Sequence, residues 1–393
     1  MKTQIACYGA KLVSDRVAAP GRVALLAQDD VLLHYGADDL VTLGRELLPR
    51  LNVTALAIAA PARPCGDLLI ARCAAGDEVI VPRDTETRTF LHDIPIVRRP
   101  PDGVHDPAHL ASLLGGRKGI AVEGLGIIAT GVTPEQAYIN VSSVYHALFV
   151  KLLLDLLRDG VRTAAEHELL ADLRREVTAA PGMEGLSFRP GPLLKPEEIL
   201  DEMARVGRYT VERGLVDSFF GNISCRAGAI LYISQTASSL DALAGCIDPV
   251  PFDGSSTVGL TASSELPAHR RIYEMTEATT ILHGHPRFAV ILSMLCEHQA
   301  DCRVVDCWKD CPAVRYLGGI PVVAGEIGAG GLAKRVPPVI GATGRAIVFG
   351  HGVFTTGKDG FSEAFRALLE VEQWCQRDYF RLLDTALAAS PKR

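Results

Sequence analysis

The sequence predicts an α/β protein built from two domains of similar size. The chain has 393 residues, which is enough for two domains that each bury a core. Segments with the apolar periodicity of helices alternate with short apolar or β-branched runs typical of buried strands. A stretch rich in proline and glycine, residues 179–196, separates the two halves. We therefore expect a first domain over 1–160, a linker over 161–195 and a second domain over 196–393.

Composition excludes some functions. The net charge is -6 and charges of both signs are dispersed, so the chain has no basic surface and nucleic acid is not an expected partner. The N-terminal residues lack a continuous apolar core, and no stretch reaches the roughly 18 apolar residues of a membrane helix. We expect a cytoplasmic protein without a membrane partner, in which the ten cysteines are reduced.

Three sequence blocks recur in the same order in both halves. In the first half they are NVTALAIAAPARP, FLHDIPIVRRPPD and GIAVEGLGIIATGVTPEQAY, which parallel EATTILHGHPRFA, YLGGIPVVAGEIG and AIVFGHGVFTTGKDGFSEAF in the second. We interpret this as a tandem duplication. The alternative is that two unrelated α/β units share a common rhythm of strands and helices.

Two histidines end a predicted strand in the second half. Residues 279–282 are apolar or β-branched, and His283 and His285 follow. Because side chains of an extended chain alternate with period two, both imidazoles point to one face and can bind one ion. The alternative is two polar residues at a strand end. A third histidine, His351, follows another buried strand, 346–349, and is flanked by glycines that allow a close backbone approach.

The first half lacks these histidines. If the repeated blocks are aligned, Ile58, Ala60 and Leu125 take the positions of the three histidines. We therefore expect the first domain to be a metal-free copy that serves packing or shapes the neighbouring site.

Four motifs of the second half carry a family resemblance. They are GNIS at 221–224, SSE at 263–265, HGHP at 283–286, and the His-Gly at 351–352 that precedes an acidic helix. In this order they resemble the class II aldolase/adducin family, whose zinc members include fuculose- and rhamnulose-phosphate aldolases. The resemblance implies two tandem three-layer α/β/α domains with mostly antiparallel central sheets, of which the first is degenerate.

The resemblance also assigns the metal centre. It makes His283, His285 and His351 the metal ligands and Glu265 the catalytic acid that moves protons next to the substrate carbonyl. Three neutral imidazoles with an open position suit Zn²⁺ as a Lewis acid, with Mn²⁺ or Co²⁺ as alternatives. A purely structural reading of Glu265 is a charge at a helix N-terminus.

Polar loops around these motifs suggest an anion site. Hydroxyl, amide and backbone N–H groups there can bind a phosphate, as the corresponding loops do in the related aldolases. Serine-rich loops also occur as plain turns, and QTASS at 235–239 departs from the TPSG usual in the family. The candidate residues are Asn222, Thr236, Ser238, Ser239, Ser263 and Ser264.

Two further features stay open. A proton donor for the departing aldehyde comes from a neighbouring subunit in the family, and Tyr379 and Tyr316 are the candidates, with Tyr379 preferred. The spacing C-x5-C-x4-C-x3-C matches neither structural zinc sites nor ferredoxins, so we expect small buried cysteines or a loop that shapes substrate choice. These cysteines are Cys296, Cys302, Cys307 and Cys311.

The resemblance favours a zinc-dependent aldolase that cleaves or forms a C–C bond in a small hydroxy-ketone, a sugar phosphate, through an enediolate. A metal-dependent epimerase or decarboxylase is the second interpretation, and a non-catalytic adducin-like binding protein is the third. Related aldolases form cyclic tetramers with active sites at subunit contacts. A duplicated chain is therefore expected to form a homodimer that mimics a tetramer of domains.

Overall fold

A computed structural model describes residues 1–217, 219–256, 261–296, 302–325 and 328–389. It divides into an N-terminal unit, Met1–Arg175 with the last residues of the chain from Ala386, and a C-terminal unit, Glu176–Thr385. The boundary falls inside helix α7 (Ala164–Ala179), within the segment expected as a linker. After α7, residues 180–195 lie outside helices and strands.

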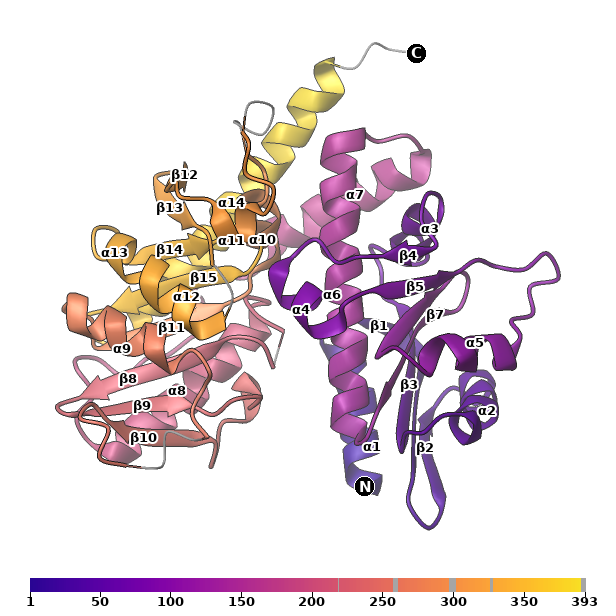
Figure 1. Ribbon diagram of the computed structural model, residues 1–393, viewed down its shortest axis with the longest axis horizontal. Coiled ribbons are helices and arrows are strands. Elements are labelled where there is room, and N and C mark those ends of the chain that lie inside the picture. The colour runs from indigo at the N-terminus through magenta and orange to yellow at the C-terminus, as the bar shows by residue number, and fades with distance from the viewer. Residues whose placement is uncertain (218, 257–260, 297–301, 326–327, 390–393) are drawn as a thin grey trace. The chain divides into compact units, whose positions relative to one another are not determined.

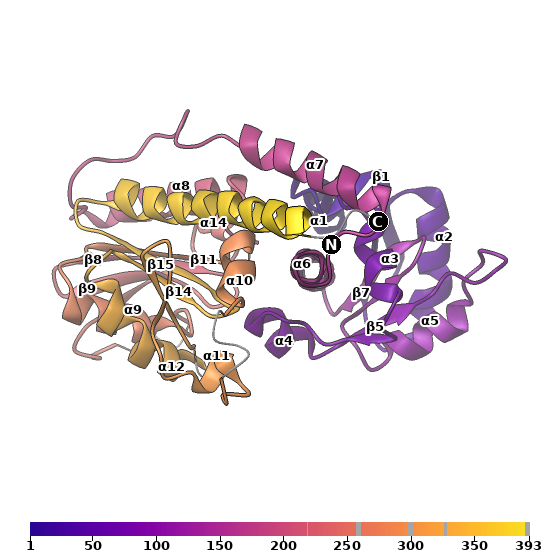
Figure 2. The same ribbon diagram turned by 90° about the horizontal axis from the view of Figure 1, so that it is seen from above.

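The N-terminal unit contains a seven-stranded sheet with helices on both faces. Figure 2 shows α1 and α6 on one face and α2 and α5 on the other. In spatial order the strands are β2 (Leu32–Gly36), β1 (Ala18–Gln28), β3 (Ala55–Pro61), β7 (Gly126–Gly131), β6 (Gly119–Val122), β5 (Ile94–Val97) and β4 (Val79–Ile80). The helices before α7 are α1 (Lys2–Ser14), α2 (Asp38–Leu47), α3 (Leu68–Ala74), α4 (Thr85–Leu91), α5 (Pro107–Leu114) and α6 (Pro134–Asp159), with a 3₁₀ turn, η1 (Leu48–Arg50).

Helix α6 is the core helix of the N-terminal unit. Thr133 caps it by accepting a hydrogen bond from the Gln136 N–H at 3.0 Å, and Pro134 occupies its first turn. The helix is long and apolar enough to cross a membrane, contrary to the sequence-based expectation, but 94% of its most apolar window is buried inside the protein. Its apolarity therefore has a ready explanation in core packing.

The C-terminal unit contains an eight-stranded sheet, also covered on both faces (Figure 1). In spatial order the strands are β10 (Ile247–Pro251), β9 (Ile230–Ser234), β8 (Asn222–Ala227), β11 (Thr280–Gly284), β15 (Gly352–Gly357), β14 (Arg345–Val348), β13 (Ile320–Val323) and β12 (Arg315–Leu317). The helices are α8 (Pro196–Glu212), α9 (Leu266–Met275), α10 (Arg287–Ser293), α11 (Cys307–Asp310), α12 (Gly328–Arg335), α13 (Pro337–Ile340) and α14 (Phe361–Ala389), with a 3₁₀ turn, η2 (Leu240–Ala242).

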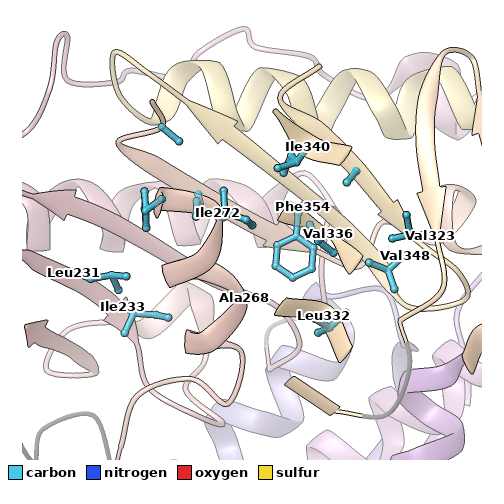
Figure 3. Close-up of a cluster of buried hydrophobic side chains, with 14 of the residues drawn as sticks. Leu231, Ile233, Ala268, Ile272, Val323, Leu332, Val336, Ile340, Val348 and Phe354 are labelled. Carbon is cyan, nitrogen blue, oxygen red and sulfur yellow. The ribbon is translucent and has the colours of Figure 1, made fainter. Parts of the chain in front are cut away.

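Helices α9 and α12 seal one face of this second sheet. Figure 3 shows Ala268 and Ile272 of α9 and Leu332 of α12 among buried side chains of the sheet. Helices α8 and α14 lie on the opposite face (Figure 2). The strongly amphipathic sequence of α8 explains this placement, because Ile199, Met203 and Val206 repeat at helical spacing and are fully buried.

The two sheets share one topology. The order β2-β1-β3-β7-β6-β5-β4 in the N-terminal unit corresponds to β9-β8-β11-β15-β14-β13-β12 in the C-terminal unit, which adds β10 at one edge. In each sheet the corresponding pair, β5–β6 or β13–β14, is parallel and the other pairs are antiparallel. The predicted fold class is confirmed.

Strand register also agrees with the sequence alignment of the two halves. Ala55 pairs with Gly131 in one sheet, and Thr280 pairs with Gly357 in the other. These pairs are the ones that the aligned sequence blocks require. The agreement supports the expected duplication, because strand pairing was not used to align the blocks.

Candidate metal centre

The three predicted ligands come from two adjacent strand ends. His283 lies on β11, in the middle of the sheet, and His285 follows the end of that strand. His351 lies in the turn between β14 and β15, and β15 pairs with β11. The ring centroids of His283 and His285 are 4.7 Å apart, and those of His285 and His351 are 4.8 Å apart. Strand pairing therefore brings together side chains that are far apart in sequence.

Their nitrogen atoms face a common point. One ring nitrogen of each histidine lies within 4.8 Å of the others. Among the described residues, these histidines form the one group of three or more His, Cys, Asp or Glu side chains whose ligand atoms are close enough to hold an ion. The Nε2 atoms of His283 and His285 are 2.9 Å apart.

Backbone contacts orient the His283 ring. Its Nδ1 atom lies 3.0 Å from the carbonyl oxygen of Val353, which can only accept a hydrogen bond, so Nδ1 carries the proton. This leaves the Nε2 lone pair free to bind a cation. Phe354 stacks on the same ring with a centroid distance of 4.0 Å, and Phe220 stacks on His285 at 5.9 Å.

A carboxylate completes the site. Glu265 immediately precedes α9, and its Oε1 atom lies 3.1 Å from Nε2 of His351. Its Oε2 atom lies 3.5 Å from Nε2 of His283 and accepts a hydrogen bond from the Asn222 amide at 2.9 Å. Glu265 and Asn222 are 9% and 6% exposed, so this carboxylate is both buried and held in place.

The electrostatics suit a divalent cation. Burial lowers the pKa of His283 to about 4, so its imidazole is neutral at pH 7, as a metal ligand must be. Burial alone would raise the pKa of Glu265, but His283, His351 and the Asn222 amide hold that pKa well below its usual range. Neutral imidazoles beside a charged carboxylate fit a metal ion such as Zn²⁺.

The sequence around this site matches a family model. Residues 201–379 match the model of the class II aldolase and adducin N-terminal domain. We call this matched part of the C-terminal unit the class II aldolase domain. Solved structures similar to it include three proteins.

L-fuculose-1-phosphate aldolase from Thermus thermophilus is 24% identical, and the match covers 50% of this chain and 98% of that chain with a TM-score of 0.38. YgbL from Escherichia coli is 21% identical over 50% and 93% of the two chains, with a TM-score of 0.39. A sugar-phosphate aldolase from Thermotoga maritima is 19% identical over 50% and 98%, with a TM-score of 0.35. No match was found among curated proteins.

Five of the six predicted phosphate-binding residues lie on two connected loops of the class II aldolase domain, and the sixth, Asn222, begins β8. Gln235 forms a β-bridge with Ala262, which joins the loop after β9 to the segment that leads to Glu265. The Thr236 hydroxyl donates to the Ala262 carbonyl at 2.9 Å, and the Ser238 hydroxyl donates to the Gln235 carbonyl at 2.7 Å. The Thr236 hydroxyl therefore joins the two loops, and the Ser238 hydroxyl closes a turn within its own loop.

The serines among these candidates differ in their surroundings. The hydroxyl of Ser239 donates to the carboxylate of Asp241, a negative neighbour for any anion. Ser263 is buried and accepts from the Glu265 N–H at 3.3 Å, whereas Ser264 is exposed. Ser263 thus holds the backbone at Glu265, and a phosphate-binding role of these residues stays a prediction.

The structure does not favour Tyr379 as a donor to another subunit. This side chain is 0% exposed and packs against Phe288 and Phe380, with ring centroids 5.3 Å away in both cases. A tyrosine enclosed in its own core does not reach a site on a neighbouring chain. Tyr316 on β12 is 63% exposed and is free of this objection.

The four clustered cysteines are less buried than expected. Cys302 is exposed, and Cys296, Cys307 and Cys311 are half-buried. The expectation of small buried cysteines is wrong here, because much of residues 302–316 lies at the surface.

A buried polar chain under the site was missed by the sequence analysis. The Ser224 hydroxyl lies 2.7 Å from Nδ1 of His269 and 2.8 Å from the Tyr273 hydroxyl. Both partners are on α9, and His269 follows Glu265 by one helical turn. The four-residue spacing between Glu265 and His269, about one helical turn, is therefore the sequence feature that could have identified His269.

The N-terminal unit has an apolar cluster at the equivalent positions. The shared register places Ala24 where Asn222 lies and Ile58 where His283 lies. Ala37 precedes α2 as Glu265 precedes α9, and Leu125 takes the place of His351. All four contribute to one hydrophobic cluster, so this unit has core packing where the class II aldolase domain has polar groups.

Proposed function

We propose that the protein is a zinc-dependent class II aldolase that cleaves or forms a C–C bond in a small hydroxy-ketone, most simply a sugar phosphate. The observation that carries this proposal is the convergence of three imidazole nitrogens with a buried carboxylate 3.1 Å from one of them. A binding protein of the adducin type would have no use for this donor set. The burial of a charged carboxylate instead indicates chemistry.

His283, His285 and His351 would hold the ion through one ring nitrogen each. When bound, Zn²⁺ supplies a Lewis acid that polarises the substrate carbonyl. The Val353 carbonyl keeps the His283 ring in the tautomer that such binding requires.

Glu265 is the residue that would move the proton. In the direction of bond formation its carboxylate takes a proton from the carbon next to the carbonyl, and in cleavage it returns that proton. The Asn222 amide, at 2.9 Å from Oε2, holds the carboxylate in position, and the Ser263 hydroxyl, at 3.3 Å from the Glu265 N–H, holds the backbone there.

The substrate phosphate would bind at the loops that carry Thr236 and Ser264. The exposed Ser264 side chain and the exposed Thr236 are adjacent to the segment that ends in Glu265. We further propose a cytoplasmic homodimer in which each chain contributes two aldolase-like units and one metal centre. The tyrosine that protonates the leaving aldehyde would come from the partner chain, with Tyr316 as the better candidate.

The test is a screen of ketose phosphates for retro-aldol cleavage by purified protein, with an aldehyde-detecting coupled assay. The expected result is cleavage that a chelator abolishes, that added Zn²⁺ restores and that His283→Ala lacks. An epimer or CO₂ as the product would replace the lyase assignment with an epimerase or decarboxylase. A protein that binds no divalent ion would overturn the proposal altogether.

A further inference from the structure

A buried carboxylate contacts the start of the helix that follows His285. Glu372, on α14, is 5% exposed. Its Oε1 atom accepts the N–H of Phe288 at 3.1 Å, and its Oε2 atom accepts the N–H of Ala289 at 3.0 Å. These are unsatisfied donors of the first turn of α10, whose N-cap is Pro286 and offers no side-chain hydrogen bond. A distant helix thus caps α10 directly after His285.

This cap is costly as a purely structural device. Burial raises the pKa of Glu372 to about 7, although the N–H groups of Phe288 and Ala289 oppose the rise. A neutral side chain at the N-cap itself would satisfy such donors without burying a carboxylate. A buried acid in place of a local cap requires another reason, and a fixed position for the preceding turn is one.

Several other contacts immobilise the same turn. Arg287 donates to the carboxylate of Asp217 at 2.9 Å. A Cβ atom at Gly284 would lie 2.7 Å from the carbonyl oxygen of Leu215, so the backbone packs tightly there. Glu372, Asp217 and Leu215 therefore hold the segment that runs from Gly284 into the first turn of α10.

The N-terminal unit provides an internal comparison. The Gln136 side chain accepts a hydrogen bond from the N–H of Val132, just before α6. The Glu363 side chain accepts the equivalent bond from the N–H of Lys358, just before α14, so these two contacts align the two helices. Counting the same distance along each helix places Tyr145 at the position of Glu372. In that unit the chain after Pro61 does not start a helix until Leu68. The acid and the helix that it caps occur in the unit that has the histidines.

We propose that Glu372 is a positioning residue for the metal centre, which anchors the start of α10 and thereby fixes the direction of the His285 ring. This inference rests on the metal centre of the proposed function but not on its substrate. It adds a residue of α14 that contacts neither the ion nor the substrate.

The test measures metal affinity rather than turnover. Glu372→Gln keeps the size of the side chain but turns an amide N–H₂ toward one of the two backbone N–H groups. We expect Zn²⁺ affinity of the folded variant, from competition with a chromophoric chelator, to fall by about tenfold or more, as for residues that orient ligands. The visible spectrum of the Co²⁺-loaded variant should change as well.

Glu370→Gln is the matched control, because Glu370 lies on the same helix and pairs with Arg345 at the surface. It should bind Zn²⁺ as the unchanged protein does. Glu372→Asp retains the charge, so its Zn²⁺ affinity should lie between those of Glu372→Gln and the unchanged protein. If Glu372→Gln does not fold, the same titration is carried out with Glu372→Asp.

Three outcomes separate the claims. A Glu372 variant that melts at a lower temperature but binds Zn²⁺ with unchanged affinity and spectrum overturns the inference and leaves the proposed function intact. Normal Zn²⁺ binding with weakened binding in Glu372→Gln, but no lyase activity on any ketose, supports the inference and removes the aldolase assignment. An unchanged protein that binds no divalent ion removes both.

Discussion

The Oε1 atom of Glu265 lies 3.1 Å from Nε2 of His351, while its Oε2 atom lies 3.5 Å from Nε2 of His283. One carboxylate therefore touches two of the three imidazoles without belonging to the same strand as either. In the proposed function this geometry separates two roles, because the imidazole nitrogens would bind the ion and the carboxylate oxygen beside them would accept a proton.

Glu265→Gln should therefore separate metal binding from catalysis. The amide keeps the shape and the contact with Asn222 but cannot accept a proton, so we expect turnover to fall by about 10²–10⁴-fold. Metal content, measured by atomic absorption, should be unchanged. Glu274→Gln, at an exposed position of the same helix, is the control and should be fully active. Full activity of Glu265→Gln would contradict its catalytic role.

Metal stoichiometry should be one ion per chain. The C-terminal unit has the three histidines, whereas the equivalent positions in the N-terminal unit are apolar. His283→Ala should reduce the bound metal to near zero, and His34→Ala, at an exposed site, should leave it unchanged. Two ions per chain, or one ion that survives His283→Ala, would show that the ion binds elsewhere.

A single methyl group at residue 352 should disrupt the centre. A Cβ atom at Gly352 would lie 2.7 Å from Cδ2 of His285 and 2.9 Å from Cε1 of His283, closer than packed atoms approach. Gly352→Ala should therefore weaken Zn²⁺ binding by at least about tenfold, since both rings must shift. Gly330→Ala has open space around the added methyl and serves as the control in the same chelator titration.

Stability should fall with acid in a defined window. Burial lowers the pKa of His269 to about 4 from an ordinary value of 6.5, although Glu265 opposes the shift. Because the unfolded chain then binds a proton that the folded chain excludes, the contribution is present above pH 6.5 and is lost as the pH falls toward 4.

Urea unfolding of metal-free protein tests this prediction. Between pH 7 and pH 5, His269 should account for a loss of about 2 kcal/mol in the free energy of unfolding. His269→Gln keeps a polar contact with Ser224 and should flatten that part of the pH dependence. His283, with a pKa of about 4, titrates in the same window, so a residual slope is expected. An unchanged slope in His269→Gln would contradict the assignment.

Short-range patterns made much of the site predictable. The period of two along a strand is enough to put His283 and His285 on one face, and the duplicated blocks predicted where the first half would be apolar. Strand register agrees with that alignment, because Ala55 and Thr280 have equivalent partners in their sheets. Because side chains of a strand alternate between two faces along the chain, a short stretch of sequence is enough to predict which of them share a face.

Other features depend on contacts between distant segments. Pairing of β11 with β15 sets how His351 meets the other histidines, and core packing removes Tyr379 from the surface on which a partner chain would find it. Glu372 reaches the N–H of Phe288 across 84 residues of sequence. No period or motif encodes such a contact, since it arises only when separate helices pack on one sheet. The sequence by itself therefore determined the family resemblance and the three histidines that meet in the fold, and tertiary packing decided which side chains surround those histidines.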